Sequence, residues 1–285
     1  MSKICLVLEG GGNRGVYTAG VLDAFLDAGI DNKNVYGVSA GALNALSYLA
    51  KQKGRHYRVN KDYALDKKCI DFKRIIVGKS VVNLDYLFNE VSRNIDPIDF
   101  DEFNKRGDYV VVATNVVTGA PVYKRIDDYD LDYKYIMASA SLPLFSKIIE
   151  VDDMKLLDGG ISDPIPVMKA IEDGYDKIVV ISTRDKVFTC KPYKFMTLYK
   201  SRYAKYPNFI KTMENRYNKY NVTRDLLTKL EMEKKVMTIY PSKPLLISNL
   251  EKDEDKLKSA YDLGYQDAKK VVNKIKEYIG GYVRV

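Results

Sequence analysis

Short runs of aliphatic and β-branched residues alternate with amphipathic stretches along the first half of the chain. The pattern predicts strands at Ile4–Leu8, Val35–Val38 and residues 109–113, and helices over residues 16–26 and 40–50. Strands that alternate with helices are typical of α/β folds with a mostly parallel sheet. The valine-rich third strand favours the same arrangement, because parallel strands are commonly buried on both faces.

A hairpin and one more buried strand follow in the middle of the chain. Residues 148–157 predict two short strands that turn at Asp152 and Asp153. Residues 177–182 predict a buried strand, which comes after a helix that Gly174 can end.

From about residue 190 onward the chain becomes rich in Lys, Tyr, Asn and Met. Residues 191–236 predict helix with one interruption at Pro207, and residues 253–278 predict a charged closing helix. The chain contains no repeat and no low-complexity linker. We therefore expect residues 1–190 to form the α/β core and residues 191–285 to form a mainly helical region packed on the same domain.

The composition describes an ordinary globular protein. Of 285 residues, 46% are apolar and 29% are charged. No apolar stretch approaches the roughly 20 residues that cross a bilayer. The first apolar run is too short for the apolar part of a signal peptide, so we expect a cytoplasmic protein. The three cysteines lie far apart and form neither a disulfide framework nor a metal-ligand cluster.

The formal net charge is +8, from 46 basic and 38 acidic residues. We expect the basic residues to be dispersed along the chain and to serve mainly solubility. Alternatively, the positive charge favours peripheral contact with an anionic membrane surface at the inner face of the membrane. The tyrosines are also spread along the chain, so we expect no nucleic-acid-binding module.

Residues 37–41 match the pattern G-x-S-x-G between a predicted strand and a predicted helix. The chain must turn sharply there to present the Ser39 hydroxyl, and Gly37 and Gly41 remove side chains that would clash. The helix that follows directs free N–H groups and its positive dipole end toward developing negative charge. Ser39 is therefore the candidate nucleophile.

Residues 10–15 form a glycine-rich loop between the first strand and the first helix. Consecutive glycines let several backbone N–H groups face one ligand, which suits an anion or an oxyanion. Gly10, Gly12 and Gly15 also satisfy the dinucleotide-binding pattern G-x-G-x-x-G, so a nucleotide- or dinucleotide-binding protein is the alternative function. That pattern expects an acidic residue at the end of the second strand, where this chain has Ser39.

Asp158, Gly159 and Gly160 follow the second arm of the predicted hairpin. An acid at a strand end before two glycines can approach another backbone closely, although such a sequence is also typical of a plain turn. The single histidine, His56, lies in a polar stretch, where we expect it to be solvated or loosely packed. It comes close after Ser39 and ahead of the acid, which does not fit the order of a Ser-Asp-His triad. A carboxylate is therefore expected to take the serine proton, and burial must raise its pKa for it to do so.

Taken together, these blocks resemble the patatin-like phospholipases, and the stretch LEGGGNRGVYTAGVLDAFL is most similar to their bacterial branch. The matching blocks occur in the expected order: residues 10–15, residues 37–41, the segment ASASLPLF at residues 138–145, and Asp158-Gly159-Gly160. Many family members carry alanine where this chain has Gly160, a change small enough to leave the role intact.

The resemblance implies a three-layer α/β/α sandwich and a serine acyl hydrolase of the phospholipase A, lysophospholipase or esterase type. The substrate would be a lipid or another fatty-acyl ester, and no metal or organic cofactor would be needed. Ser39 would be the nucleophile of a Ser-Asp dyad, with Asp158 as base. The oxyanion hole would consist of loop amides, with Arg14 fixing the loop, and the amides would come from Gly11, Gly12 and Asn13.

Overall fold

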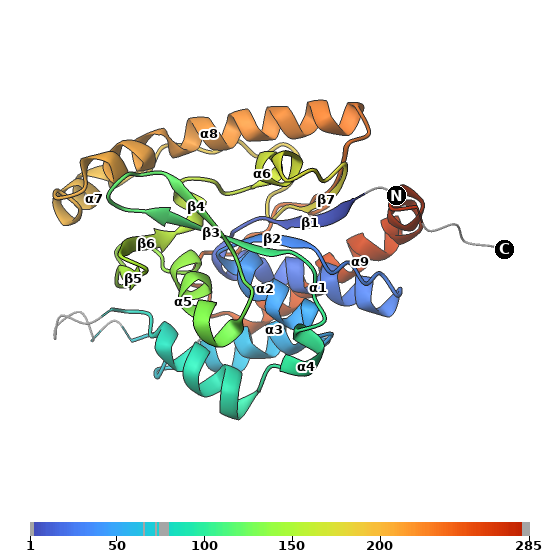
Figure 1. Cartoon of the computed structure of the whole chain (residues 1–285), viewed down its shortest axis with the longest axis horizontal. Helices are drawn as coiled ribbons and strands as arrows, with labels where there is room; N and C mark the ends of the chain where they lie inside the picture. Colours follow the sequence, from blue (N-terminus) through green and yellow to red (C-terminus); the bar gives the residue numbers. More distant parts are fainter. Residues whose placement is uncertain (1–2, 65, 72, 74–79, 281–285) are drawn as a thin grey trace.

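One eight-stranded sheet runs through the part of the chain that the computed structural model describes, which comprises residues 3–64, 66–71, 73 and 80–280 (Figure 1). The strand order is β5-β6-β3-β2-β1-β7-β8, and β4 pairs with β3. The pairs among β1, β2, β3, β7 and β8 are parallel, whereas β4, β5 and β6 pair in antiparallel fashion. The strands are β1 Ile4–Leu8, β2 Val35–Val38, β3 Tyr109–Asn115, β4 Pro121–Arg125, β5 Ile149–Val151, β6 Met154–Asp158, β7 Lys177–Ile181 and β8 Val236–Ile239.

Helices cover both faces of this sheet, in three layers (Figure 1). α6 and α8 lie on one face, and α1, α2, α5 and α9 lie on the other with the shorter helices. The α-helices are α1 Gly15–Asp27, α2 Ala40–Leu49, α3 Arg55–Arg58, α4 Phe100–Phe103, α5 Tyr129–Ser139, α6 Val167–Glu172, α7 Met196–Arg202, α8 Pro207–Met232 and α9 Glu254–Tyr278. Two π-helical segments, Val59–Ala64 and Tyr86–Ile95, follow α3 and precede α4.

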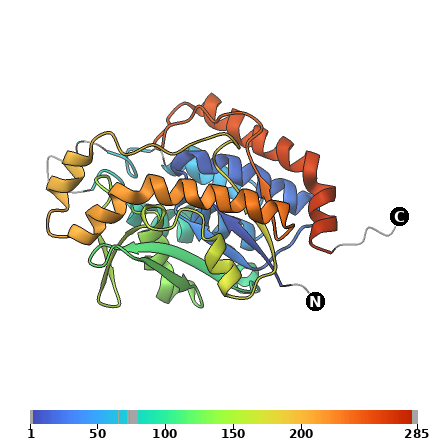
Figure 2. The same cartoon turned by 90° about the horizontal axis from the view of Figure 1, so that it is seen from above.

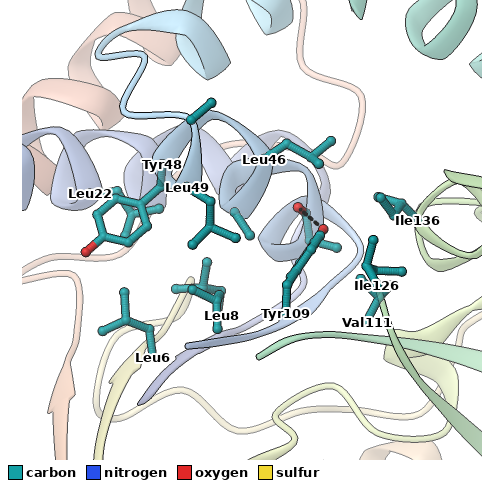
Figure 3. Packing of buried hydrophobic residues seen from close by; sticks show 14 of the residues in the cluster. Leu6, Leu8, Leu22, Leu46, Tyr48, Leu49, Tyr109, Val111, Ile126 and Ile136 are labelled. Atoms are coloured by element: carbon teal, nitrogen blue, oxygen red, sulfur yellow. Dashed lines mark hydrogen bonds between the residues drawn. The ribbon is translucent and has the colours of Figure 1, made fainter. Parts of the chain in front are cut away.

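Alternate side chains of the central strand β1 enter two different cores, as the period of a strand requires. Leu6 and Leu8 pack beneath α1 and α2, where Leu22, Leu46 and Leu49 meet them (Figure 3). In the same core, the Tyr109 hydroxyl donates a hydrogen bond of 2.8 Å to the Ala42 carbonyl (Figure 3). This bond ties β3 to the first turns of α2.

The opposite face of β1 directs Cys5 and Val7 into a second core beneath α6 and α8. The long helix α8 runs across this face (Figure 2) and contributes Tyr220 and Leu227 to the buried cluster. The sandwich predicted from the family resemblance is therefore confirmed.

The C-terminal region completes the sandwich rather than standing apart from it. Its strand β8 extends the sheet beside β7, and α9 packs along α1 (Figures 1 and 2). α1 and α9 approach closely at two glycines: a Cβ at Gly20 would overlap the Tyr261 carbonyl oxygen, and one at Gly264 would overlap the Tyr17 carbonyl oxygen. A larger side chain at either glycine would force the two helices apart.

Most element boundaries follow the hydrophobic pattern, with a few differences. Asp152 and Asp153 both have positive φ, as a tight hairpin turn requires. The helical region is interrupted directly before Pro207, close to the predicted position, and Pro207 begins α8 because proline fits the first helical position. The pattern did not predict β4 or α5.

Within the described ranges, no helix combines the length and the apolar character that crossing a membrane requires.

Candidate active site

Ser39 occupies the sharp turn between β2 and α2. Its backbone has φ 53° and ψ −121°, a strained region for a residue with a side chain. Its N–H donates a hydrogen bond of 2.8 Å to the hydroxyl oxygen of Ser139, at the end of α5. The serine is buried at the N-terminus of α2, where the helix dipole favours negative charge.

The two glycines that flank the turn are required by close backbone contacts. A Cβ at Gly37 would lie 2.7 Å from the Cα of Ala42, and a Cβ at Gly41 would overlap the Leu8 carbonyl oxygen. Neither obstacle is a flexible side-chain end, so a larger residue would displace the turn that presents Ser39.

The register of the sheet explains why Asp158 reaches Ser39. β4 occupies one edge of β3, and two other strands share the opposite edge. β2 pairs along this edge as far as Val112, and β6 pairs from Ala113 onward in the opposite direction. The two strands therefore approach each other end to end. Ser39 follows the last residue of β2 and Asp158 is the last residue of β6, so they meet at the junction.

Ser39 and Asp158 form a short hydrogen bond. The serine Oγ donates to Oδ2 of the carboxylate at 2.6 Å, and the N–H of Gly160 donates to Oδ1 at 2.7 Å. A Cβ at Gly159 would overlap the carbonyl oxygen of Val112, so this residue must be glycine for the loop to lie against β3. Each carboxylate oxygen thus has one donor, and the side chain is held in one orientation.

Burial raises the pKa of Asp158 from 3.8 to about 6. The side chain is only 3% exposed. The hydrogen bonds from Ser39 and Gly160 and the charge of Arg216 act in the opposite direction and limit the rise in pKa. The carboxylate is therefore ionised at neutral pH while being more basic than a solvated aspartate.

The segment 138–145, one of the blocks found in the sequence, holds both members of the pair. Ser139 accepts the N–H of Ser39, and the carbonyl of Ser141 accepts the N–H of Asp158 at 2.9 Å. Leu142 and Phe145 from the same segment line the cavity beside the pair. This block thus positions the two side chains relative to each other.

The glycine-rich loop lies against Ser39 and the start of α2. A Cβ at Gly10 would lie 3.2 Å from the Ser39 Cβ, and one at Gly15 would lie 2.7 Å from the Ala40 Cβ. A Cβ at Gly11 would lie 2.7 Å from the Thr183 hydroxyl oxygen. The loop is therefore packed between the end of β7 and the serine turn.

Residues 247–251 of the C-terminal region cover this loop. The Asn13 N–H donates to the Asn249 carbonyl at 3.1 Å, and the Asn13 side chain donates to the Glu251 carbonyl at 2.7 Å. Arg14 donates to the Ile247 carbonyl at 3.1 Å and to Oδ1 of Asn249 at 2.6 Å. Arg14 thus fixes the loop, by holding a segment that the sequence did not connect with it.

This arrangement corrects one expectation. The sequence predicted that the amides of Gly11, Gly12 and Asn13 would face a common oxyanion, but the Asn13 amide is engaged by Asn249. Gly12 has φ +55°, and a Cβ there would lie 2.8 Å from the Asn249 carbonyl oxygen. Of these three amides, those of Gly11 and Gly12 have no backbone acceptor in the part of the chain that the structure describes.

Two cavities meet at Ser39. The first, of about 110 Å³, has mainly aliphatic and aromatic walls from α2 and the π-helical segments, with Leu43, Leu46, Leu87 and Phe88 among them. The second, of about 360 Å³, is more polar and also borders Asp158. Its polar walls include Arg14, Tyr193, Tyr199 and Arg216.

Arg216 is a site residue that the sequence did not indicate. It projects from α8, and its Nε donates a hydrogen bond of 2.6 Å to the carbonyl of Gly160, two residues after the aspartate. Its guanidinium also contacts the ring of Tyr193. No motif marks this arginine, because it reaches the site through tertiary packing of the C-terminal region.

The structure contradicts the environment that we expected for His56. The sequence predicted a solvated or loosely packed residue, but the side chain is 6% exposed and lines the apolar cavity. Nε2 lies 3.0 Å from the Asn60 amide nitrogen. Burial, with a smaller effect of Arg55, lowers the pKa of the imidazole to about 3. His56 is therefore neutral at physiological pH.

The described residues contain no group of histidine, cysteine and carboxylate side chains that could hold a metal ion. A dinucleotide site also needs an acidic residue at the end of the second strand. That position carries Ser39, whose hydroxyl is hydrogen-bonded to Asp158. The geometry instead combines a serine, a carboxylate and a glycine loop at one point.

Comparisons with known proteins show which family and which fold this chain resembles. A model of the patatin-like phospholipases matches residues 6–171, and a domain family of unknown function (DUF6363) matches residues 206–280. The uncharacterised protein YjjU of Escherichia coli is 30% identical over 278 residues, which cover 92% of this chain and 75% of that protein. An uncharacterised NTE family protein of Mycobacterium tuberculosis is 25% identical over 182 residues, which cover 63% of this chain and 49% of the mycobacterial protein.

Among solved structures, VipD from Legionella pneumophila has a similar fold. The TM-score is 0.53 at 13% sequence identity, and the match covers 96% of this chain and 67% of VipD. This likeness concerns the fold alone. The family model spans more than half of the chain, and the chain therefore belongs to the patatin-like phospholipase family, whose members are lipid-acyl hydrolases.

Proposed function

We propose that this protein hydrolyses carboxylic esters of lipids, as a phospholipase A, lysophospholipase or esterase, with Ser39 as nucleophile and Asp158 as general base. The observation that carries the proposal is the 2.6 Å hydrogen bond from the Ser39 hydroxyl to the buried carboxylate. A serine bonded to a base, at a strand-to-helix turn beside a glycine loop, is the arrangement that nucleophilic acyl transfer requires.

In the first half of the reaction, the serine Oγ attacks the ester carbonyl carbon and its proton passes to Oδ2 of Asp158. The tetrahedral intermediate then collapses, the bond to the alcohol oxygen breaks, and the alcohol leaves with the proton from Asp158. In the second half, Asp158 takes a proton from water, the hydroxide attacks the acyl-enzyme, and Ser39 leaves with that proton. The carboxylate is therefore base and acid in turn.

The raised pKa of Asp158 supports its role as base. A solvated carboxylate with a pKa near 4 is a weak base for a hydroxyl group. Burial brings the pKa to about 6, so the group is more basic and still ionised at pH 7 and above. The hydrogen bond from Gly160 keeps the other oxygen occupied, which leaves Oδ2 directed at Ser39.

The oxyanion in this proposal is stabilised by the amides of Gly11 and Gly12 and by the N-terminus of α2. Donors that are already oriented in a buried site stabilise developing charge without reorganisation. Arg14 and the segment 247–251 hold the loop that carries these amides, through hydrogen bonds at 3.1 and 2.6 Å.

The two cavities suggest how an ester binds. The apolar cavity suits the acyl chain, and the polar cavity suits the alcohol portion, which the arginines Arg14 and Arg216 favour when it carries negative charge. Both cavities border Ser39, so an ester bound across them places its carbonyl carbon at the nucleophile. No metal or organic cofactor enters any step.

A fluorophosphonate probe tests the proposal. The wild-type protein should be labelled on Ser39, and Ser39→Ala should not be labelled. Ser47→Ala, which removes another serine of α2, is the matched control and should be labelled like the wild type. Equal labelling of Ser39→Ala and the wild type contradicts the assignment. A panel of lipid esters analysed by mass spectrometry then identifies the preferred substrate.

A further inference from the structure

The basic residues are dispersed along the chain, as expected, but most of the net positive charge arises in one segment that lacks acidic residues. Between Asp185 and Glu214 there are seven Lys and Arg residues and no acidic residue. This segment therefore contributes seven of the eight net positive charges of the chain. It contains α7 and about the first two turns of α8, which lie together at one end of the molecule in both views (Figures 1 and 2).

Few of these basic side chains are neutralised. Within the described residues, Lys186 pairs with Glu231 at 3.6 Å and Lys200 pairs with Glu214 at 2.6 Å. No ion pair within 4.0 Å is found there for the other five, which are Lys191, Lys194, Arg202, Lys205 and Lys211. Unpaired cations attract an anionic surface, whereas paired ones largely do not.

α7 and the residue that precedes it carry large exposed apolar side chains. Met196, Tyr199 and Tyr203 face inward and pack on a buried cluster. Phe195, which directly precedes the first residue of α7, and Leu198 are 73% and 57% exposed. We name residues 191–206 the α7 surface. A single exposed leucine is ordinary, but an apolar pair among unpaired cations is the composition of a lipid-binding interface.

The α7 surface is also a wall of the active site. Tyr193 and Tyr199 line the polar cavity at Ser39. The Tyr203 hydroxyl accepts the N–H of Leu144 at 3.0 Å, which ties α7 to the segment that positions the serine and aspartate. A surface bound to α7 would therefore lie beside the cavity through which an ester reaches Ser39.

We propose that the α7 surface binds the protein to anionic lipid bilayers and presents the polar cavity to them. The inference rests on the proposed lipid hydrolase function, because placing the polar cavity at a bilayer serves an enzyme whose substrate is a lipid. Unpaired Lys and Arg contact the headgroups, and Phe195 and Leu198 enter the boundary between headgroups and acyl chains. Nucleic acid is the less suitable occupant, because the large apolar side chains next to the cations and the adjoining ester-sized cavity suit lipid.

The experiment uses the full chain and two kinds of vesicles, phosphatidylcholine alone and phosphatidylcholine mixed with phosphatidylglycerol. Binding by co-sedimentation should require phosphatidylglycerol and should weaken as salt rises. The triple variant Lys194→Gln, Arg202→Gln and Lys205→Gln should bind about a hundredfold more weakly, because each such charge strengthens binding about fivefold. Phe195→Ser with Leu198→Ser should bind about tenfold more weakly or worse.

A charge-matched control comes from α9, whose C-terminal end lies far from α7 in both views (Figures 1 and 2). Lys269→Gln, Lys274→Gln and Lys276→Gln remove the same charge and should leave vesicle binding unchanged. The inference is overturned if the α9 variant loses binding as much as the α7 variant does. It is equally overturned if the wild type binds both vesicles alike, or if single-stranded nucleic acid competes the protein off the anionic vesicles.

Hydrolysis of a short-chain, water-soluble ester separates this inference from the proposed function. The α7 variants should hydrolyse that ester like the wild type, because their substituted residues do not line either cavity. If no ester is hydrolysed but anionic vesicles still bind through α7, the proposed function fails and the docking surface stands. If the ester is hydrolysed while the α7 variants bind vesicles normally, the docking surface fails and the proposed function stands.

Discussion

Replacing Asp158 with asparagine should remove activity and stabilise the fold at the same time. Asparagine has the shape of aspartate, so its carbonyl oxygen can still accept the N–H of Gly160, which the carboxylate now accepts at 2.7 Å. Its amide can no longer take the proton of Ser39. We expect the turnover number at pH 8 to fall by about two to four orders of magnitude, the usual contribution of a general base.

The stability effect follows from the pKa of the buried carboxylate, which rises from 3.8 to about 6 on folding. Below pH 3.8 both states hold the proton, and the group does not make stability depend on pH. Between the two values the unfolded state loses the proton first, so stability falls as pH rises. Above about pH 6 the decrease in the free energy of unfolding is complete. It amounts to about 3 kcal/mol, because each pKa unit corresponds to about 1.36 kcal/mol.

Asp158→Asn lacks this charge, so its free energy of unfolding at pH 8 should exceed that of the wild type by up to about 3 kcal/mol. The gain should shrink as the pH is lowered through 6 and should vanish near 4. Urea denaturation at a series of pH values measures the difference. Asp225→Asn, on the exposed side of α8, is the control and should change neither activity nor stability.

Two results would contradict the expected effect of the Asp158 charge on stability. A variant that is less stable than the wild type at pH 8 would mean that the carboxylate holds the fold together through its hydrogen bonds. A stability gain that stays constant from pH 4 to pH 8 would mean that the pKa of Asp158 is not raised. Either result would mean that the ionised Asp158 carboxylate does not destabilise the folded protein.

Three further predictions concern the surroundings of the pair. His56→Gln should keep at least about a tenth of the turnover number and the same acidic limb of the pH profile, since the imidazole, with a pKa of about 3, does not titrate in that range; an inactive, folded variant would point to a histidine base. Ser139→Ala leaves the buried N–H of Ser39 without its acceptor, so kcat should fall by about tenfold with little change in KM; an unchanged kcat would remove Ser139 from the positioning of Ser39. Gly264→Val should lower the free energy of unfolding by about 3 kcal/mol in denaturant titration, because its side chain meets the Tyr17 carbonyl; unchanged stability would show that α1 and α9 can separate freely.

The sequence predicts the parts of this fold that local patterns determine. The boundaries of β1 and β2 follow from short apolar runs, and the turn at Ser39 follows from its two flanking glycines. Asp158 could be proposed as partner of Ser39 by elimination and by family resemblance. What no local pattern contains is the register, in which β6 continues the edge of β3 where β2 ends.

The remaining features depend on contacts between distant segments. His56 lies in a polar stretch of sequence, yet α3 packs against α2 and buries it beside the apolar cavity. Arg216 and Asn249 reach the site because α8 and the segment 247–251 pack over the catalytic loops. The hydrogen bonds that Arg216 and Asn249 form at the site each join residues more than 50 positions apart in the chain. Such contacts leave no periodicity or spacing in the sequence.

Trapping the acyl-enzyme tests most directly whether Ser39 is the nucleophile. The protein is mixed with an activated ester, quenched in acid and digested with trypsin, and the peptide of residues 34–51 is fragmented by mass spectrometry. We expect one acyl group on Ser39 and none on Ser47, with no acyl group in Ser39→Ala and much slower acylation in Asp158→Asn. An acyl group on another residue, or full turnover by Ser39→Ala, would contradict this expectation.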